Sequence, residues 1–255
     1  MQPCANNRGG AARGPTDKGR SSQPNVLTIK RDRVTGRDRV TGINFKGTPY
    51  NDILKQLSSA LEKGNFSSFS HTAAVALLYQ CGKSKCMRFP EGLIPLVVLG
   101  ISFSDNENGA KAIGNAVYGL QNLEGSHDLV AALAVKIAAS RAVLSTQAIG
   151  NAVYGLQNLD GSQKSTRDLV AALAVKVRAS SSALDAQAIG NAVYGLQNLD
   201  GSHRSTHALV AALAVKVRDS GATLDAQAIG NAVSDPRTTS LPPEAKKRVE
   251  SVRLG

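Results

Sequence analysis

The chain has 255 residues, of which 42% are hydrophobic, so it is long and apolar enough to build a sizeable core. Three scattered cysteines exclude a secreted disulfide framework. The sequence contains no run of 18 apolar residues, so we predict no membrane span. The net charge of +11 favours an anionic partner, and we expect an intracellular protein with no membrane partner.

The N-terminal residues 1–48 carry much of the positive charge, with ten Lys or Arg residues against three Asp or Glu. They are rich in Gly, Arg, Ser and Asn and show no helical periodicity. The hexapeptide Arg-Asp-Arg-Val-Thr-Gly occurs twice in succession, at 31–36 and 37–42, which is typical of a low-complexity linker. We therefore predict a disordered basic tail, or a transit peptide for a mitochondrion or plastid, and otherwise a cytoplasmic protein.

Residues 49–107 are predicted to form a degenerate helical repeat region. A first helix begins near Thr48, its predicted N-cap, with Pro49 in its first turn, and ends at Gly64. A second helix is expected from about Ser70 through Gln80, ending near Gly82. A third follows Pro90, although Pro95 interrupts its pattern.

Residues 108–233 contain an internal repeat. The string Ile113–Leu123 recurs from Ile149 and from Ile189, and a fourth copy from Ile229 stops after Val233. A second string, Leu-Val-Ala-Ala-Leu-Ala-Val-Lys, starts at 129, 169 and 209. Each unit reads as two amphipathic helices, and one such pair cannot bury its apolar face alone. We predict an all-α fold, an α-solenoid of stacked helical hairpins of about 40 residues, with disordered termini that include a basic tail at 234–255.

Helix starts can also be predicted. Ser145, Asp185 and Asp225 precede the first helices of their units as N-caps, whereas Ser165 or Ser205 can cap the second helices. Glycines within the first helices, as at 150 and 155, reflect either recent duplication or a close approach of neighbouring helices.

A polar stripe remains on the first helix of each unit when the apolar face is subtracted. Stacked in register, it would form a ladder whose amides bond base edges and whose rings stack on bases. Alternatively, these side chains contact adjacent units and satisfy buried polar groups. The stripe comprises Asn115, Tyr118, Asn122, Asn151, Tyr154, Asn158, Asn191, Tyr194 and Asn198.

Cations recur near the ends of the second helices. As a basic ladder they could follow a phosphate backbone, or they could stabilise the helix C-termini. These residues are Lys136, Lys176, Lys216, Arg178 and Arg218.

Catalytic and metal motifs are not expected. Cys81 and Cys86 have no second pair, and His203 and His207 are Gln163 and Arg167 in the preceding unit. The sequence contains no nucleophile elbow, phosphate loop or dinucleotide fingerprint, so we predict a protein that is not an enzyme and needs no cofactor.

The segment 184–199, Leu-Asp-Ala-Gln-Ala-Ile-Gly-Asn-Ala-Val-Tyr-Gly-Leu-Gln-Asn-Leu, resembles the first helix of octotricopeptide-type repeats, and the Leu-Val-Ala-Ala-Leu-Ala segment is similar to their second helix. The resemblance covers roughly residues 108–233. It implies an organellar protein that binds single-stranded RNA and acts in RNA processing, stability or translation. The alternative is a protein-interaction scaffold that grips an extended peptide. Because the fourth copy breaks off at Ser234 without a polar cap, a fragment of a longer array is a further interpretation.

Overall fold

The computed structural model describes residues 26–84, 88–123 and 126–224. The expectations for the remaining positions, including the tail at 234–255, the cap at Asp225 and the first 25 residues, lie outside the described residues. Within the described ranges, no helix is long and apolar enough to cross a membrane.

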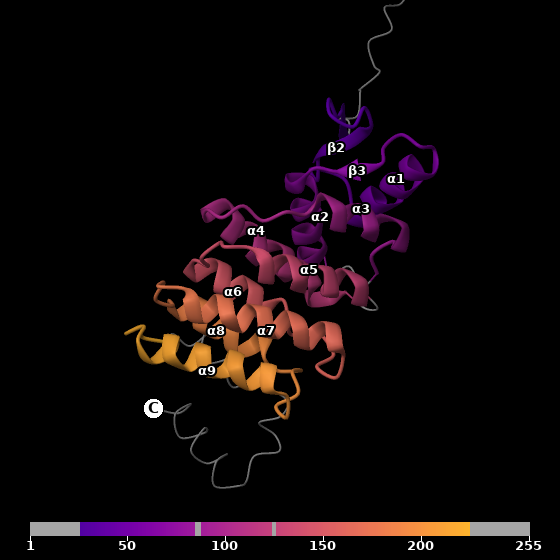
Figure 1. The fold of residues 1–255 in the computed structure, drawn as a ribbon. Helices are drawn as coiled ribbons and strands as arrows, with labels where there is room; N and C mark the ends of the chain where they lie inside the picture. Colours follow the sequence, from indigo (N-terminus) through magenta and orange to yellow (C-terminus); the bar gives the residue numbers. More distant parts are fainter. Residues whose placement is uncertain (1–25, 85–87, 124–125, 225–255) are drawn as a thin grey trace, which may run out of the picture.

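Most of the structure is a stack of helix pairs arranged in two rows (Figure 1). Helices of the first row contact one another in chain order, and so do those of the second row. The first row contains α2 (His71–Lys83), α4 (Glu107–Tyr118), α6 (Thr146–Tyr154) and α8 (Ala186–Gly195). The second row contains α3 (Ile94–Gly100), α5 (His127–Ala139), α7 (Lys164–Ala179) and α9 (Arg204–Arg218). The predicted stacking of helical hairpins is confirmed.

The core runs between the rows without interruption, because the same repeat positions are buried in successive units. Ile113 and Ile149 of the first row are 0% exposed, as are Leu133 and Leu173 of the second row. Full burial of such a side chain contributes about 2 kcal/mol, so the stack is stabilised by its inter-unit contacts.

Glycine sets how closely the first-row helices approach one another. A Cβ atom on Gly155 would overlap the backbone carbonyl of Val117, and one on Gly195 would overlap that of Val153. These glycines are therefore required for the packing of α4, α6 and α8. Of the two explanations for the glycines, recent duplication or close helix approach, the structure supports close approach.

The predicted N-caps of the first-row helices are confirmed. The backbone N–H of Ala148 donates to Ser145 Oγ at 3.3 Å, and that of Ala188 donates to Asp185 Oδ1 at 2.7 Å. The caps predicted for the second-row helices are wrong. The N–H of Gln163 donates to the carbonyl of Asp160 in a turn, and α7 begins directly after it at Lys164, so Ser165 lies in the first turn of the helix. Helix α9 likewise begins at Arg204, one residue before Ser205.

The prediction of an all-α chain with a disordered segment 1–48 is wrong for residues 26–48. This segment forms an antiparallel hairpin of β1 (Leu27–Arg31) and β2 (Asp38–Ile43), and β2 also pairs in parallel with the short β3 (Ser68–Phe69). The strands are rich in β-branched residues, Val40 is fully buried, and Gly36 supplies the positive φ of 65° that the turn needs. The two hexapeptide copies are thus a hairpin and not a linker.

The region before the array gives the stack its first layer. Helix α1 (Tyr50–Glu62) has Pro49 itself as N-cap, so the predicted Thr48 cap is wrong, whereas Gly64 ends the helix with φ 69° as expected. Ser70 caps α2, which ends at Lys83, one residue beyond the predicted end near Gly82. The 3₁₀ turn η1 (Glu91–Leu93) leads into α3, where Pro95 lies in the first turn and starts the helix instead of interrupting it.

Candidate functional site

Four tyrosines form a column along the first row of helices. The rings of Tyr118 and Tyr154 are 5.7 Å apart and inclined by 16°, and those of Tyr154 and Tyr194 are 5.4 Å apart and inclined by 19°. Tyr79 of α2 extends the column at 5.3 Å from Tyr118. The predicted register of the tyrosine ladder is confirmed. Tyr79 was missed, although it lies about one repeat length before Tyr118 in the sequence.

Amides lie beside the tyrosines and complete a polar groove of about 500 Å³. Asn151 and Asn191 were predicted, whereas Gln147 and Gln187, one turn earlier on the same helices, were missed. Their spacing of four residues from each asparagine was the available signal. We call this surface the tyrosine–amide face. Its described lining residues are Tyr79, Tyr118, Gln147, Asn151, Tyr154, Gln187, Asn191 and Tyr194, all of them uncharged in their ordinary states.

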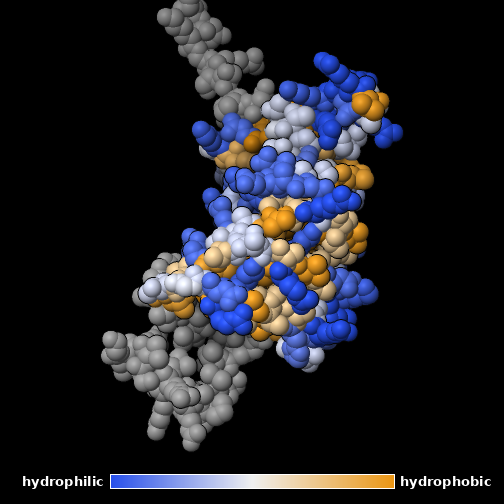
Figure 2. All heavy atoms as spheres, turned by 60° about the vertical axis from the view of Figure 1, so that its left-hand side comes forward, coloured by the Kyte–Doolittle hydropathy of each residue, from blue (hydrophilic) through white to orange (hydrophobic). Residues whose placement is uncertain are grey.

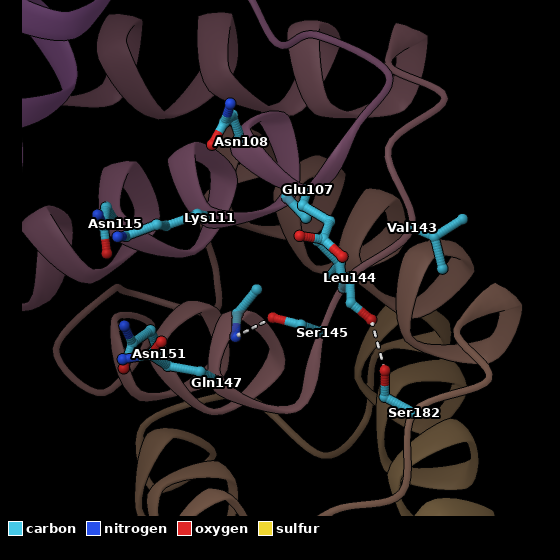
Figure 3. A pocket seen from close by; sticks show the side chains of 12 residues that line it. Glu107, Asn108, Lys111, Asn115, Val143, Leu144, Ser145, Gln147, Asn151 and Ser182 are labelled. Carbon is cyan, nitrogen blue, oxygen red and sulfur yellow. Dashed lines mark hydrogen bonds between the residues drawn. The ribbon is translucent and has the colours of Figure 1, made fainter.

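A second groove of about 590 Å³ continues this polar surface toward the loop before α6 (Figure 3). It shares Gln147 and Asn151 with the first groove and adds Asn115 and Lys111 from α4. Glu107 and Lys111 give it one charge of each sign. Ser182 Oγ, in the loop before α8, donates to the carbonyl of Leu144 in the loop before α6 at 3.3 Å and so links successive units. Figure 2 shows hydrophilic and hydrophobic residues interspersed over the repeat stack on the side that it displays.

The remaining asparagines of the predicted stripe have a different position. Asn122 and Asn158 follow the ends of α4 and α6, and their Nδ2 atoms donate to the carbonyls of Gly82 and Gln121 at 3.0 and 2.6 Å. Asn198, after the end of α8, donates from Nδ2 to the carbonyl of Gln157 at 2.5 Å. These three residues link each unit to the one before it, as the alternative interpretation of the stripe expects.

The lysines of the second row are engaged in the same manner. Lys136 Nζ donates to the carbonyl of Ile101 at 2.9 Å, Lys176 Nζ to that of Ser140, and Lys216 Nζ to that of Ser180. Each acceptor is the C-terminal cap residue of the preceding second-row helix, where a cation is stabilised by the helix dipole. Burial lowers the pKa of Lys176 from its usual value.

The two arginines do not line the tyrosine–amide face either. Arg178 is exposed near the end of α7. Arg218 forms an ion pair with Asp219 at 2.8 Å, and this contact raises the pKa of the guanidinium. The structure therefore separates the predicted cations from the predicted amide and tyrosine ladder.

The chemistry of the tyrosine–amide face is that of neutral hydrogen bonding. Burial raises the pKa of Tyr154, so its phenol stays protonated at neutral pH and can both donate and accept. Tyr118 and Tyr154, the inner residues of the column, each contact a tyrosine ring on either side, and the tyrosines and amides line the groove. Lys83 Nζ lies 5.5 Å from the ring of Tyr79, at the outer end of the column.

Among the described residues, no three His, Cys, Asp or Glu side chains are grouped so that they could hold a metal ion. Cys81 is buried and Cys86 lies outside the described ranges. His203 Nε2 lies 3.3 Å from Asp200.

The chain was compared with protein-family models, with curated proteins and with solved structures, and none of the three comparisons gave a match.

Proposed function

We propose that this chain binds single-stranded RNA along the tyrosine–amide face. The observation that carries the proposal is the repetition of one chemical unit, an amide pair with a tyrosine, in register on α6 and α8, with Tyr118 and Tyr79 extending it. A ladder of identical groups suits a polymer whose chemical units also repeat.

The amides have the hydrogen-bonding capacity that this ligand requires. Asn and Gln side chains each present a donor and an acceptor, which pair with the exposed edges of unstacked bases. Because the tyrosine rings stack on one another, we expect bases to lie across the groove and bond to amide and phenol groups, without inserting between rings. This differs from the stacking of bases on tyrosines expected from the sequence.

The resemblance to octotricopeptide-type repeats supports the same ligand. It extends the proposal to a role in organellar RNA processing, stability or translation. The proposed setting is inside the cell, in a mitochondrion or plastid if the N-terminal segment acts as a transit peptide.

A second candidate function, a scaffold that holds an extended peptide, is favoured by one observation. The tyrosine–amide face has no charged lining residue among those described, and the second-row lysines bond to backbone carbonyls. Side-chain amides can bond to the N–H and C=O groups of a peptide as well as to bases.

The test is binding of the full chain to fluorescein-labelled homopolymeric RNA oligonucleotides, measured by fluorescence anisotropy. The variant N151A/N191A removes two amides from the face and should weaken binding by about 100-fold, taking about a factor of ten per amide. The matched control N51A/Q56A removes two exposed amides from α1 and should leave binding unchanged.

Equal affinities for N151A/N191A and its control would contradict RNA binding at this face. If N151A/N191A instead loses affinity only for extended peptides, which can be screened on a peptide array, the scaffold function replaces the proposed one.

A further inference from the structure

The hairpin of β1 and β2 lies at the N-terminal end of the stack (Figure 1), and its sequence has an excess of cations. Residues 30–39 contain five Lys or Arg residues and two Asp residues. The tandem hexapeptides do not occupy equivalent positions, because the first forms the end of β1 and the turn, whereas the second forms β2.

The carboxylates of the hairpin are used within it. Asp32 Oδ1 accepts the backbone N–H groups of Val34 and Thr35, both at 2.9 Å, and Asp32 Oδ2 lies 3.1 Å from Arg39 Nη1. The backbone bonds of the turn keep the pKa of Asp32 below its usual value. Asp38 lies 3.9 Å from Arg31. One acid therefore shapes the turn, and both acids have cationic neighbours.

Three cations of the hairpin face solvent without such a neighbour. Lys30, Arg33 and Arg37 are exposed, and within the described part of the chain no carboxylate lies within ion-pair distance of them. Charged residues on β1 also protect a sheet edge from pairing with other chains. That function does not explain Arg33 and Arg37, which lie in the turn and immediately before β2.

The hairpin is fixed to the helical stack. Arg39 Nη2 donates to the carbonyl of Phe69 at 3.1 Å, and the N–H groups of Ser67 and Ser70 donate to the carbonyls of Asp38 and Val40 at 3.0 and 2.8 Å. Strand β2 contacts α2, the helix that carries Tyr79, so the hairpin and the tyrosine–amide face share a supporting helix.

We propose that the hairpin is a phosphate-binding arm, whose Lys30, Arg33 and Arg37 contact the backbone of an RNA chain lying on the tyrosine–amide face. This inference rests on the proposed function. It supplies what that face lacks, since the face offers neutral groups to bases while the ligand carries one negative charge per nucleotide. Base contacts and phosphate contacts are then made by separate parts of the fold.

The experiment measures the affinity of the full chain for a labelled 20-nucleotide oligo(U) across a salt series. The variant is K30Q/R33Q/R37Q. Loss of three phosphate contacts should make the negative slope of log K against log salt less steep by about 2. The affinity gained on lowering the salt from about 1 M to about 0.1 M should then be about 100-fold smaller for the variant than for the parent chain. The control K55Q/K63Q/K164Q removes three exposed lysines elsewhere and should keep the slope. Thermal melting checks that both variants remain folded.

An unchanged slope for K30Q/R33Q/R37Q, or an equal change in the control, would overturn the arm. If the slope changes as expected but N151A/N191A binds normally, the arm stands and the proposed base-binding face fails. If N151A/N191A loses binding while the hairpin variant keeps its slope, the face stands and the arm fails. Competition by polyglutamate at the same concentration of charge as the RNA would show an acidic peptide site and overturn the assignment to RNA.

Discussion

Replacing Gly155 by Ala tests whether close helix approach holds the stack together. From the sequence alone the change should stabilise the protein by about 1 kcal/mol, because Ala favours helices over Gly. In the structure the new Cβ overlaps the carbonyl of Val117 and approaches Cα of Tyr118 to 2.8 Å. These are backbone atoms of α4, so they cannot move aside as a side chain could.

The helices must separate to admit the methyl group, which weakens the burial between α4 and α6. Overpacking of this kind costs about 1–3 kcal/mol, and more when backbone has to shift. We expect a net loss of about 2 kcal/mol in the free energy of unfolding, and a Tm lower by roughly 4–8 °C.

Gly201 provides the matched control. It has no neighbouring atom within 4 Å of an added Cβ and no positive φ, so Gly201→Ala should change the free energy of unfolding by less than about 0.5 kcal/mol. Urea unfolding followed by circular dichroism measures both variants. A Gly155→Ala protein as stable as the parent, or more stable, would refute the packing argument.

Two further predictions concern titratable groups, the buried Lys176 and the partly buried His71. Lys176→Ala removes the donor to the carbonyl of Ser140 and should lower the free energy of unfolding, measured in urea, by about 2 kcal/mol. The control Arg178→Ala changes an exposed residue two positions away and should alter this free energy by less than about 0.5 kcal/mol. Equal losses in the two variants would contradict the capping role of Lys176. Burial lowers the pKa of His71, whose Nδ1 accepts the N–H of Ser102 at 3.3 Å, so the unfolded state binds the proton more readily. Stability should therefore fall as the pH drops through the usual value of 6.5 toward the lowered pKa, and His71→Asn should reduce that slope in melts recorded across this range.

The repeats made the array predictable, because each near-identical unit is long enough to form two helices and packs against copies of itself. The hairpin was not predicted because its strands are short and only Val40 of the duplicated hexapeptides is fully buried, so the apolar alternation that marks a strand is masked by Arg and Asp. Its β-branched residues and Gly36 were the available signal.

The candidate site was predictable only where helical spacing persists. Asn151 and Tyr154 lie on one face of α6, and both were placed correctly on the ladder. Asn158 was placed on the same stripe by counting seven residues from Asn151, but α6 ends at Tyr154 and the backbone then turns. Its side chain consequently bonds to the preceding unit. Which polar groups join units and which face a ligand depends on that helix end.

The lysine contacts between successive second-row helices also affect the order of events during synthesis. The carbonyl at the end of α5 receives its donor from Lys176, so that helix end is completed by residues made about one repeat later. The carbonyl at the C-terminus of α5 therefore has this hydrogen bond only after the next unit has been synthesised and has folded. Since domains generally form from the N-terminus during synthesis, the stack should grow in one direction, each new pair of helices securing the pair made before it.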